Sequence, residues 1–169
     1  MVDENVKNSD KSLVVERVIN CPIEKVFNAW IEPKALKRWF FPGNMSLPLA
    51  EVDARVGGKF KITMKNPEDA EENPGVEYTA FGTYQKVKPN EALVMTWAWV
   101  GPESHESLLS IFFKPVETGT KVTLFHDRFA NKSERDHHNE GWIGCMDNFV
   151  NYFNNAVSTS NNEATEVAV

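Results

Sequence analysis

The sequence predicts an α+β fold: one strand, two short helices, a run of antiparallel strands and a final long helix. Three observations predict it. Residues 12–19 are rich in β-branched side chains, apolar strand-like segments separated by turn signals fill 45–129, and apolar residues recur at helical spacing over 133–155. Because helices and strands are segregated along the chain, we expect one antiparallel sheet of six to seven strands.

Proline, glycine and capping residues mark the ends of these elements. Pro22 and Pro33 fit the first turns of the two short helices, where a missing N–H costs no hydrogen bond. The pair 57–58 is Gly-Gly, which suits the positive φ angles of a tight hairpin turn. Ser133 and Asp136 have capping-box spacing at the start of the last helix. The expected elements are a strand at 12–19, helices at 20–30 and 32–41, strands at 45–53, 59–65, 76–87, 92–100, 107–116 and 121–129, and a helix from about Ser133 to Asn155.

The chain is expected to form a single domain over residues 12–156. The polar segment 1–11 and the segment 157–169 are expected to be flexible, because neither has a periodic apolar pattern. The acidic segment 66–75 carries two prolines and is predicted to be an exposed loop.

The composition excludes several classes of partner and location. A net charge of −6 argues against binding to nucleic acid or to an anionic membrane, because phosphates require Lys and Arg. No apolar run approaches the roughly 18 residues of a membrane span, and the first residues lack the features of a signal peptide. Cys21 and Cys145 form no CxxC motif, so we expect buried free thiols in the reducing cytoplasm.

The last helix is predicted to have one apolar face. At 100° per residue its inward stripe contains His138, Trp142, Met146, Phe149 and Phe153. His137, Glu140 and Asp147 fall on the opposite side, so His137 and His138 cannot chelate one ion together.

Two of the expected strands carry a matching inward face. Leu93, Met95, Trp97 and Trp99 alternate along one strand, and Val122, Leu124 and His126 alternate along another. A curved sheet with the long helix across it would bury these side chains and bring His126 near His138. The large side chains either fill the space between sheet and helix or line a cavity there, and both outcomes stay open at this stage.

Five stretches between residues 14 and 156 form a recognisable series of motifs. They are VFNAWIEPKALKRWF, EVDARVGGKFKI, GTYQKVKPNEALVMTW, TKVTLFHDRF and RDHHNEGWIGCMDNF. In the last stretch His138, Gly141 and Trp142 have the spacing H-x-x-G-W. With these stretches in this order, the chain resembles SRPBCC or START-like proteins, and within them domains homologous to the activator of the heat-shock-protein-90 ATPase, abbreviated AHSA.

The resemblance implies a helix-grip fold, in which a curved antiparallel sheet wraps around a long C-terminal helix. It also implies a small internal cavity, and we expect Trp39 to line the mouth of that cavity. Apolar and aromatic walls with a few polar groups are typical of small-ligand sites. The predicted ligand-binding residues are Trp39, Phe60, Ile62, Tyr84, Met95, Trp97, His126, His138, Trp142, Met146 and Phe149, with Met64 and Trp99 as further apolar candidates.

His126 and His138 also allow chemical interpretations. A modest pKa shift would place either near neutrality for general acid–base catalysis, with Tyr84, Asp53 or Arg55 as a partner. A zinc site would need a third ligand that no spacing supplies, so the predicted protein has no metal or other cofactor. Asp53 and Arg55 are two residues apart on a predicted strand, so they lie on one face and can form an ion pair. We favour a structural role for this pair, such as fixing the hairpin, over a functional one.

Three functional hypotheses follow, and the sequence favours a non-enzymatic one. The first is binding of a small apolar or aromatic ligand between sheet and helix. The second is a chaperone-associated or regulatory protein-interaction module, and the third is a polyketide cyclase-like enzyme that uses His126 or His138. The sequence is compatible with a monomer or a homodimer.

Overall fold

The structure, a computed structural model, describes residues 9–102 and 104–166, with side chains described up to residue 156. This part of the chain contains seven strands and three helices. They are β1 (Leu13–Ile19), α1 (Ile23–Asn28), α2 (Pro33–Trp39), β2 (Ser46–Val52), β3 (Lys59–Lys65), β4 (Glu77–Lys88), β5 (Ala92–Trp99), β6 (Ser107–Val116), β7 (Gly119–Asp127) and α3 (Lys132–Glu166).

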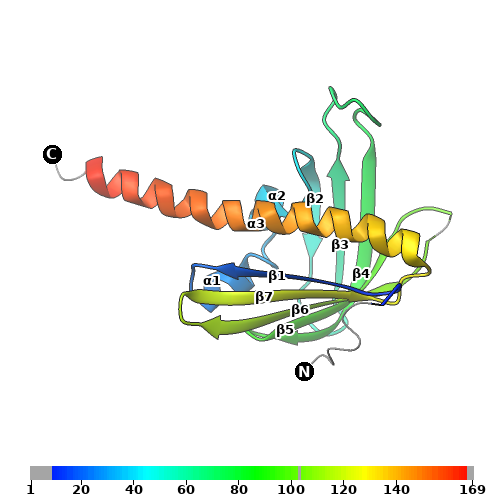
Figure 1. Ribbon diagram of the computed structural model, residues 1–169, viewed down its shortest axis with the longest axis horizontal. Helices are drawn as coiled ribbons and strands as arrows, with labels where there is room; N and C mark the ends of the chain where they lie inside the picture. Colours follow the sequence, from blue (N-terminus) through cyan, green and yellow to red (C-terminus); the bar gives the residue numbers. More distant parts are fainter. Residues whose placement is uncertain (1–8, 103, 167–169) are drawn as a thin grey trace.

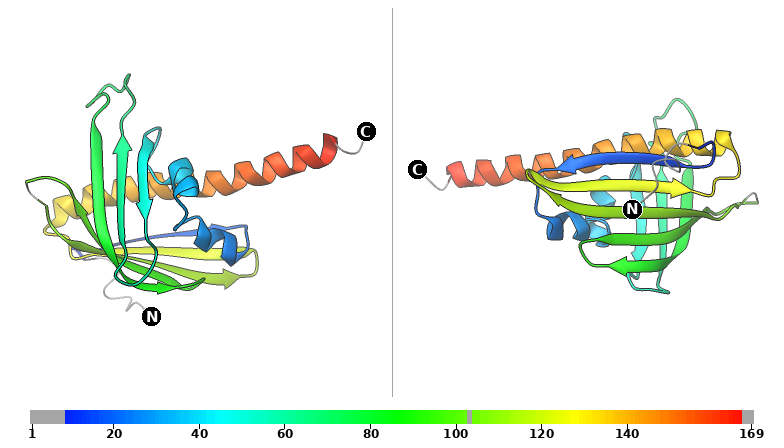
Figure 2. Two further views of the ribbon diagram at one scale, coloured as in Figure 1. Left: turned by 180° about the vertical axis from the view of Figure 1, so that it is seen from behind. Right: turned by 60° about the horizontal axis from the view of Figure 1, so that its bottom comes forward.

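The seven strands form one antiparallel sheet in the order β1-β7-β6-β5-β4-β3-β2. Figures 1 and 2 show that the sheet curves strongly, so that β2, β3 and β4 stand across the direction of β1, β6 and β7. α3 crosses the hollow side of the sheet and continues past its edge, while α2 lies beside the middle of α3 and α1 lies below it, next to β6 and β7. The predicted helix-grip architecture is confirmed.

The bend between the two parts of the sheet lies at β4 and β5. The pairing of these strands shifts register between Tyr84 and Lys86, and such a bulge increases local twist. At Gly82 a Cβ atom would collide with the Thr96 carbonyl oxygen and the Phe60 ring. Only glycine permits this close approach of backbones, which lets the sheet fold over towards α3.

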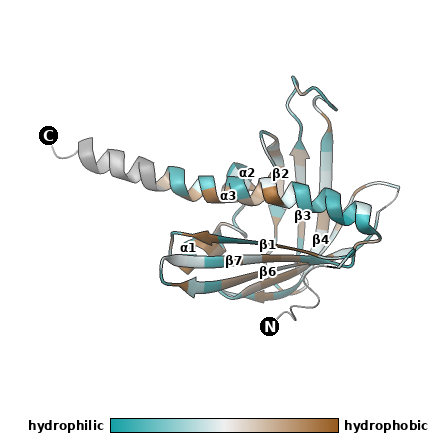
Figure 3. Ribbon diagram, in the orientation of Figure 1, coloured by the Kyte–Doolittle hydropathy of each residue, from teal (hydrophilic) through white to brown (hydrophobic). Residues whose placement is uncertain are grey.

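Aromatic side chains fill the interior between α2, α3 and the turn that follows α1. The ring centroids of Trp39 and Phe149 lie 4.3 Å apart, and those of Trp30 and Trp39 lie 4.6 Å apart. Figure 3 shows hydrophilic residues on the first turns of α3 and hydrophobic residues where the helix passes α2. Phe149 and Met146 are fully buried there, which confirms the predicted inward stripe.

The start of α3 is capped two residues earlier than the sequence predicts. Asn131 Oδ1 accepts the Glu134 N–H at 2.9 Å, and Glu134 Oε2 accepts the Ala130 N–H at 2.7 Å. The capping box predicted at Ser133 and Asp136 is therefore wrong. Asp136 instead forms ion pairs with its neighbours Lys132 (2.9 Å) and Arg135 (2.8 Å).

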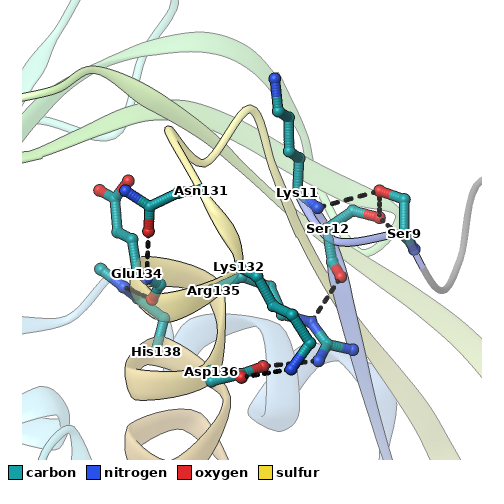
Figure 4. Close-up of polar contacts among 9 residues, drawn as sticks. All are labelled: Ser9, Lys11, Ser12, Asn131, Lys132, Glu134, Arg135, Asp136 and His138. Carbon is teal, nitrogen blue, oxygen red and sulfur yellow. Dashed lines mark hydrogen bonds and ion pairs between the residues drawn. The ribbon is translucent and has the colours of Figure 1, made fainter.

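A hydrogen bond joins this first turn of α3 to the residue that precedes β1. Arg135 Nε donates to the Ser12 carbonyl oxygen at 3.0 Å, and the Ser9 and Ser12 hydroxyls lie 2.9 Å apart (Figure 4). His138 projects from the next turn of the same helix. The cap and this bond fix the end of α3 that carries the candidate site.

α3 extends to Glu166, well beyond the predicted end near Asn155. The prediction relied on apolar periodicity, which ends near Phe153, but an existing helix extends without a new nucleation cost. The predicted flexibility of 1–11 and 157–169 stays a prediction; residues 1–8 and 167–169 lie outside the described residues.

Candidate functional site

An open pocket lies between α3 and the strands β3, β4 and β5. Its volume is about 330 Å³. Aromatic rings and two methionines form most of its walls, and no Asp, Glu, Lys or Arg is found among the described residues that line it. The lining residues are Pro42, Met45, Met64, Asn66, Tyr78, Trp97, Trp99, His137, His138, Gly141, Trp142 and Cys145.

Helical and strand periodicity place these side chains together. One wall comes from α3, where residues at i, i+3, i+4 and i+7 share a face. The opposite wall comes from β5, where Trp97 and Trp99 alternate and therefore point to the same side of the sheet. The α3 residues at this spacing are His138, Gly141, Trp142 and Cys145.

A hydrogen bond between Trp99 and His138 joins the two walls. Trp99 Nε1 donates to His138 Nε2 at 2.9 Å, so Nδ1 carries the proton and donates to the Glu134 carbonyl oxygen at 2.8 Å. Burial lowers the pKa of His138, and the hydrogen bond to Glu134 only partly opposes this effect. His138 is therefore a neutral side chain of fixed tautomer at the edge of the pocket.

A second chain of hydrogen bonds lies behind the first, around the fully buried His126. Trp142 Nε1 donates to His126 Nδ1 at 3.0 Å, which leaves the proton on Nε2 to be donated to Ser107 Oγ at 2.6 Å. The Ser107 hydroxyl then donates to the Trp97 carbonyl oxygen at 3.0 Å. Burial, and secondarily His138, lowers the pKa of His126 well below its ordinary value.

The two histidines lie close together, as the sequence predicted. Their ring centroids are 5.3 Å apart. A general base needs a nitrogen that can accept a proton, and on each ring that nitrogen already accepts an indole N–H. Among the described residues no group of His, Cys, Asp and Glu is placed to hold a metal ion. The geometry of both histidines thus serves to orient Trp99 and Trp142.

The predicted ligand-binding residues fall into three groups. Trp97, His138 and Trp142 line the open pocket. A second group surrounds an internal void of about 20 Å³, which is large enough for one water molecule at most. The members of this second group are Phe60, Ile62, Tyr84 and Met95, together with Trp97. A third group, fully buried in the core, consists of Trp39, His126, Met146 and Phe149.

Trp39 does not line the mouth of the pocket, contrary to the prediction. It is 0% exposed, and its Nε1 donates to the Ala29 carbonyl oxygen at 3.0 Å. The helix α2 ends with its last turn packed under α3, so the side chain points into the aromatic core against Phe149. The packing of α2 against α3 determines this orientation, and it could not be predicted from the spacing of residues in the sequence.

Several lining residues were missed in the sequence. Tyr78 lies on β4 and has the same strand parity as Tyr84, so period-two alternation places it on the same face of the strand as that predicted residue. Gly141 was recognised as part of a motif without a binding role. Pro42 and Met45 come from the loop between α2 and β2, and Asn66 follows β3; none of these belongs to a periodic pattern.

The other predicted polar groups lie away from the pocket. Arg55 Nε pairs with Asp53 Oδ2 at 2.9 Å on the exposed turn before β3, and neither residue lines the pocket. Gly57 has φ +84°, as expected for this turn. Both cysteines are free, but Cys21 is only half-buried because it lies in the short connection between β1 and α1. The prediction of two buried thiols is therefore wrong for Cys21.

Comparison with known proteins identifies the family that the fold and the pocket suggest. The family model described as "Activator of Hsp90 ATPase homolog 1-like protein" matches residues 20–154. The chain belongs to this family. None of the curated proteins matches it. None of its described helices is long and apolar enough to cross a membrane.

Solved structures of bacterial proteins show the same fold. An AHSA1 protein from Silicibacter pomeroyi is 25% identical, with 82% of this chain and 94% of that chain covered and a TM-score of 0.70. An AHSA1-like protein from Aeromonas hydrophila is 24% identical, with 86% and 93% covered and a TM-score of 0.65. A protein from Chromobacterium violaceum is 22% identical, with 83% and 95% covered and a TM-score of 0.73.

Proposed function

We propose that the protein binds a small, largely apolar molecule in the pocket between α3 and β3–β5. The observation that carries this proposal is the pocket itself, about 330 Å³ in volume with aromatic, methionine and proline walls. Pockets of this size and composition are typical of small-molecule sites, in which burial of apolar area supplies most of the affinity.

The filled interior limits the size of the ligand. Phe149, Met146 and Trp39 occupy the space beneath the middle of α3, and the void beside Tyr84 has a volume of about 20 Å³. The ligand therefore occupies the open pocket next to Trp99 and does not extend into the core. A long acyl chain that runs the length of the helix does not fit this proposal.

Polar groups at the rim would orient the ligand. Tyr78 is partly exposed. Asn66, in the loop between β3 and β4, and His137, in α3, line the same pocket. An uncharged ligand with one polar substituent would place that substituent towards these residues and its apolar part towards Trp97 and Trp142. Two free thiols are compatible with a cytoplasmic location, which we include in the proposal.

Native mass spectrometry of the purified protein, followed by extraction of bound compounds, tests the proposal. A co-purified apolar compound supports it, and its release should lower the melting temperature because a ligand stabilises the state that binds it. Protein without any bound compound, whose melting temperature no apolar or aromatic compound raises, contradicts it.

A matched pair of variants locates the site. Met45→Glu places a carboxylate on the pocket wall, and we expect the affinity to fall by about tenfold or more because the charge loses its solvation when the ligand covers it. Ile143→Glu introduces the same charge at an exposed apolar residue of α3 outside the pocket and should leave the affinity unchanged. Equal losses in both variants would place the ligand elsewhere.

The family match favours a second candidate function. A member of the Activator of Hsp90 ATPase homolog 1-like family could act on a chaperone of the heat-shock-protein-90 type. This function predicts that the protein changes the ATPase rate of such a chaperone in a purified mixture. An unchanged rate over a concentration range that saturates a known activator would rule it out.

A further inference from the structure

Two glycines lie within one turn of α3, at positions 141 and 144. Glycine destabilises the interior of a helix relative to alanine, because it loses more backbone freedom on folding. Each glycine therefore needs a structural reason, and the surroundings of the two differ.

Packing accounts for Gly144. A Cβ atom there would lie 3.2 Å from Pro42 Cβ and 3.5 Å from the Gly43 nitrogen. Asn148, one turn later, donates from Nδ2 to the carbonyl oxygens of Phe41 (2.6 Å) and Gly43 (3.0 Å). Gly144 thus lets the loop after α2 approach the helix closely enough for these bonds.

Packing does not account for Gly141. A Cβ atom built there has no described atom within 4 Å, although the residue lies between the pocket residues His138 and Trp142. A methyl group would enter the pocket and meet no part of the chain. The missing Cβ therefore leaves a strip of bare helix backbone as part of the pocket wall.

The rings around this strip indicate what lies against it. Trp97 packs against Trp99 with ring centroids 5.4 Å apart and against Trp142 at 5.2 Å, and Tyr78 faces the same pocket from β4. Offset and edge-to-face contacts favour an aromatic guest over an aliphatic one of equal size. Thioethers such as that of Met64 also make favourable contacts with aromatic rings.

We propose that Gly141 is a specificity-determining position, where an uncharged planar aromatic ring of the ligand lies against the backbone of α3. This inference rests on the proposed ligand-binding function and adds the chemical class of the ligand. The ring fills the space that a side chain at position 141 would take, between the walls formed by α3 and β5.

Binding of N-phenyl-1-naphthylamine, an uncharged aromatic fluorophore, tests the role of Gly141. In Gly141→Ala we expect the dissociation constant to rise by about tenfold, and in Gly141→Leu by more, because the added atoms occupy the ring site. Without ligand, the melting temperature of Gly141→Ala should rise by about 2–4 °C through better helix propensity. Glu140→Ala, on the exposed face of the same turn, should bind the probe as the unmodified protein does.

Competition by two hydrocarbons of the same skeleton tests the chemical class. Naphthalene is planar and aromatic, whereas decahydronaphthalene is saturated and thicker. We expect naphthalene to displace the fluorophore at a concentration at least several-fold lower, and we expect Gly141→Leu to remove that preference.

The outcomes separate this inference from the proposed function. Binding that is equally strong in all Gly141 variants, or equal displacement by the two hydrocarbons, overturns the inference and leaves ligand binding intact. If the unmodified protein binds neither the fluorophore nor any compound in the extraction experiment, the proposed function fails and the inference fails with it. Loss of the fold in Gly141→Ala, seen as a lowered melting temperature, overturns the assignment of free space at this position.

Discussion

Trp142 donates its indole N–H to Nδ1 of His126 at 3.0 Å, and this bond fixes which nitrogen of a fully buried imidazole carries the proton. The hydrogen bonds continue to β5, because the remaining N–H of His126 donates to Ser107 Oγ and the Ser107 hydroxyl donates to the Trp97 carbonyl oxygen. A pocket residue of α3 is thereby connected to a pocket residue of β5. The aromatic walls are thus held by directional bonds as well as by packing.

Replacing His126 tests this connection. His126→Leu retains much of the volume but removes the acceptor for Trp142, and a buried donor without a partner costs about 1–3 kcal/mol. We expect the free energy of unfolding, measured in urea, to fall by that amount. His137→Leu, a change at an exposed residue of α3, should alter it by less than about 0.5 kcal/mol.

The pairwise part of the effect is accessible from a double-mutant cycle. Trp142→Phe removes the donor, so the His126→Leu change should cost less in that background than in the unmodified protein. If the two changes were additive, the hydrogen bond would not be the source of the lost stability.

The two buried histidines also predict how stability depends on pH. Burial lowers the pKa of both His126 and His138 in the folded protein, so below about pH 6.5 the unfolded chain binds protons that the folded chain does not. The contribution of the two neutral histidines to stability is therefore fully present near pH 7.5, and the free energy of unfolding should fall as the pH drops towards 5. The slope should approach about 1.4 kcal/mol per pH unit for each histidine.

Urea unfolding between pH 5.5 and 7.5 measures this slope. The window avoids most of the opposing effect of Asp127, whose pKa is raised by burial and which therefore favours the folded state at lower pH. In His126→Leu one of the two contributions is gone and the slope should decrease. An identical slope in that variant would show that His126 is protonated equally in the folded and unfolded chains.

Much of the fold could be predicted from the sequence, because its signals are local and periodic. The alternation at Trp97 and Trp99 and the helical stripe through His138 and Trp142 placed both walls of the pocket correctly. The approach of His126 and His138 followed from the same two patterns.

The shape of the pocket could not be predicted, because it depends on how separate elements pack. Trp39 looked like a mouth residue but is buried, since α2 turns its last residue under α3. Met45 lies in the wall because the loop after α2 folds against α3, an arrangement that Gly144 permits. Tyr84 was chosen in place of Tyr78 because alternation gives the face of a strand and not the position along it.

The cap of α3 gives a further prediction. Asn131→Ala removes the acceptor for the Glu134 N–H and should lower the free energy of unfolding by about 1 kcal/mol. Ser133→Ala changes the residue that the sequence pattern favoured as the cap. It lies exposed inside the first turn, so its replacement should change stability by less than about 0.5 kcal/mol. The reverse order of the two effects would restore the capping box at Ser133.

Trp39 and Tyr78 should separate stability from binding. Trp39→Phe removes the N–H that bonds to Ala29 and leaves a gap beside Phe149, so the free energy of unfolding should fall by about 1–3 kcal/mol. Its affinity for N-phenyl-1-naphthylamine should stay within about twofold, because the side chain does not reach the pocket.

Tyr78→Ala should have the opposite effects. Tyr78 is 38% exposed at the rim of the pocket, so its replacement should cost little stability. The affinity should fall, because an aromatic contact worth about 0.5–1.5 kcal/mol is lost. Both quantities are measured on the same preparations, by urea unfolding and by fluorescence titration. A loss of affinity in Trp39→Phe that exceeds the loss in Tyr78→Ala would mean that the ligand enters the core beneath α3 rather than the open pocket.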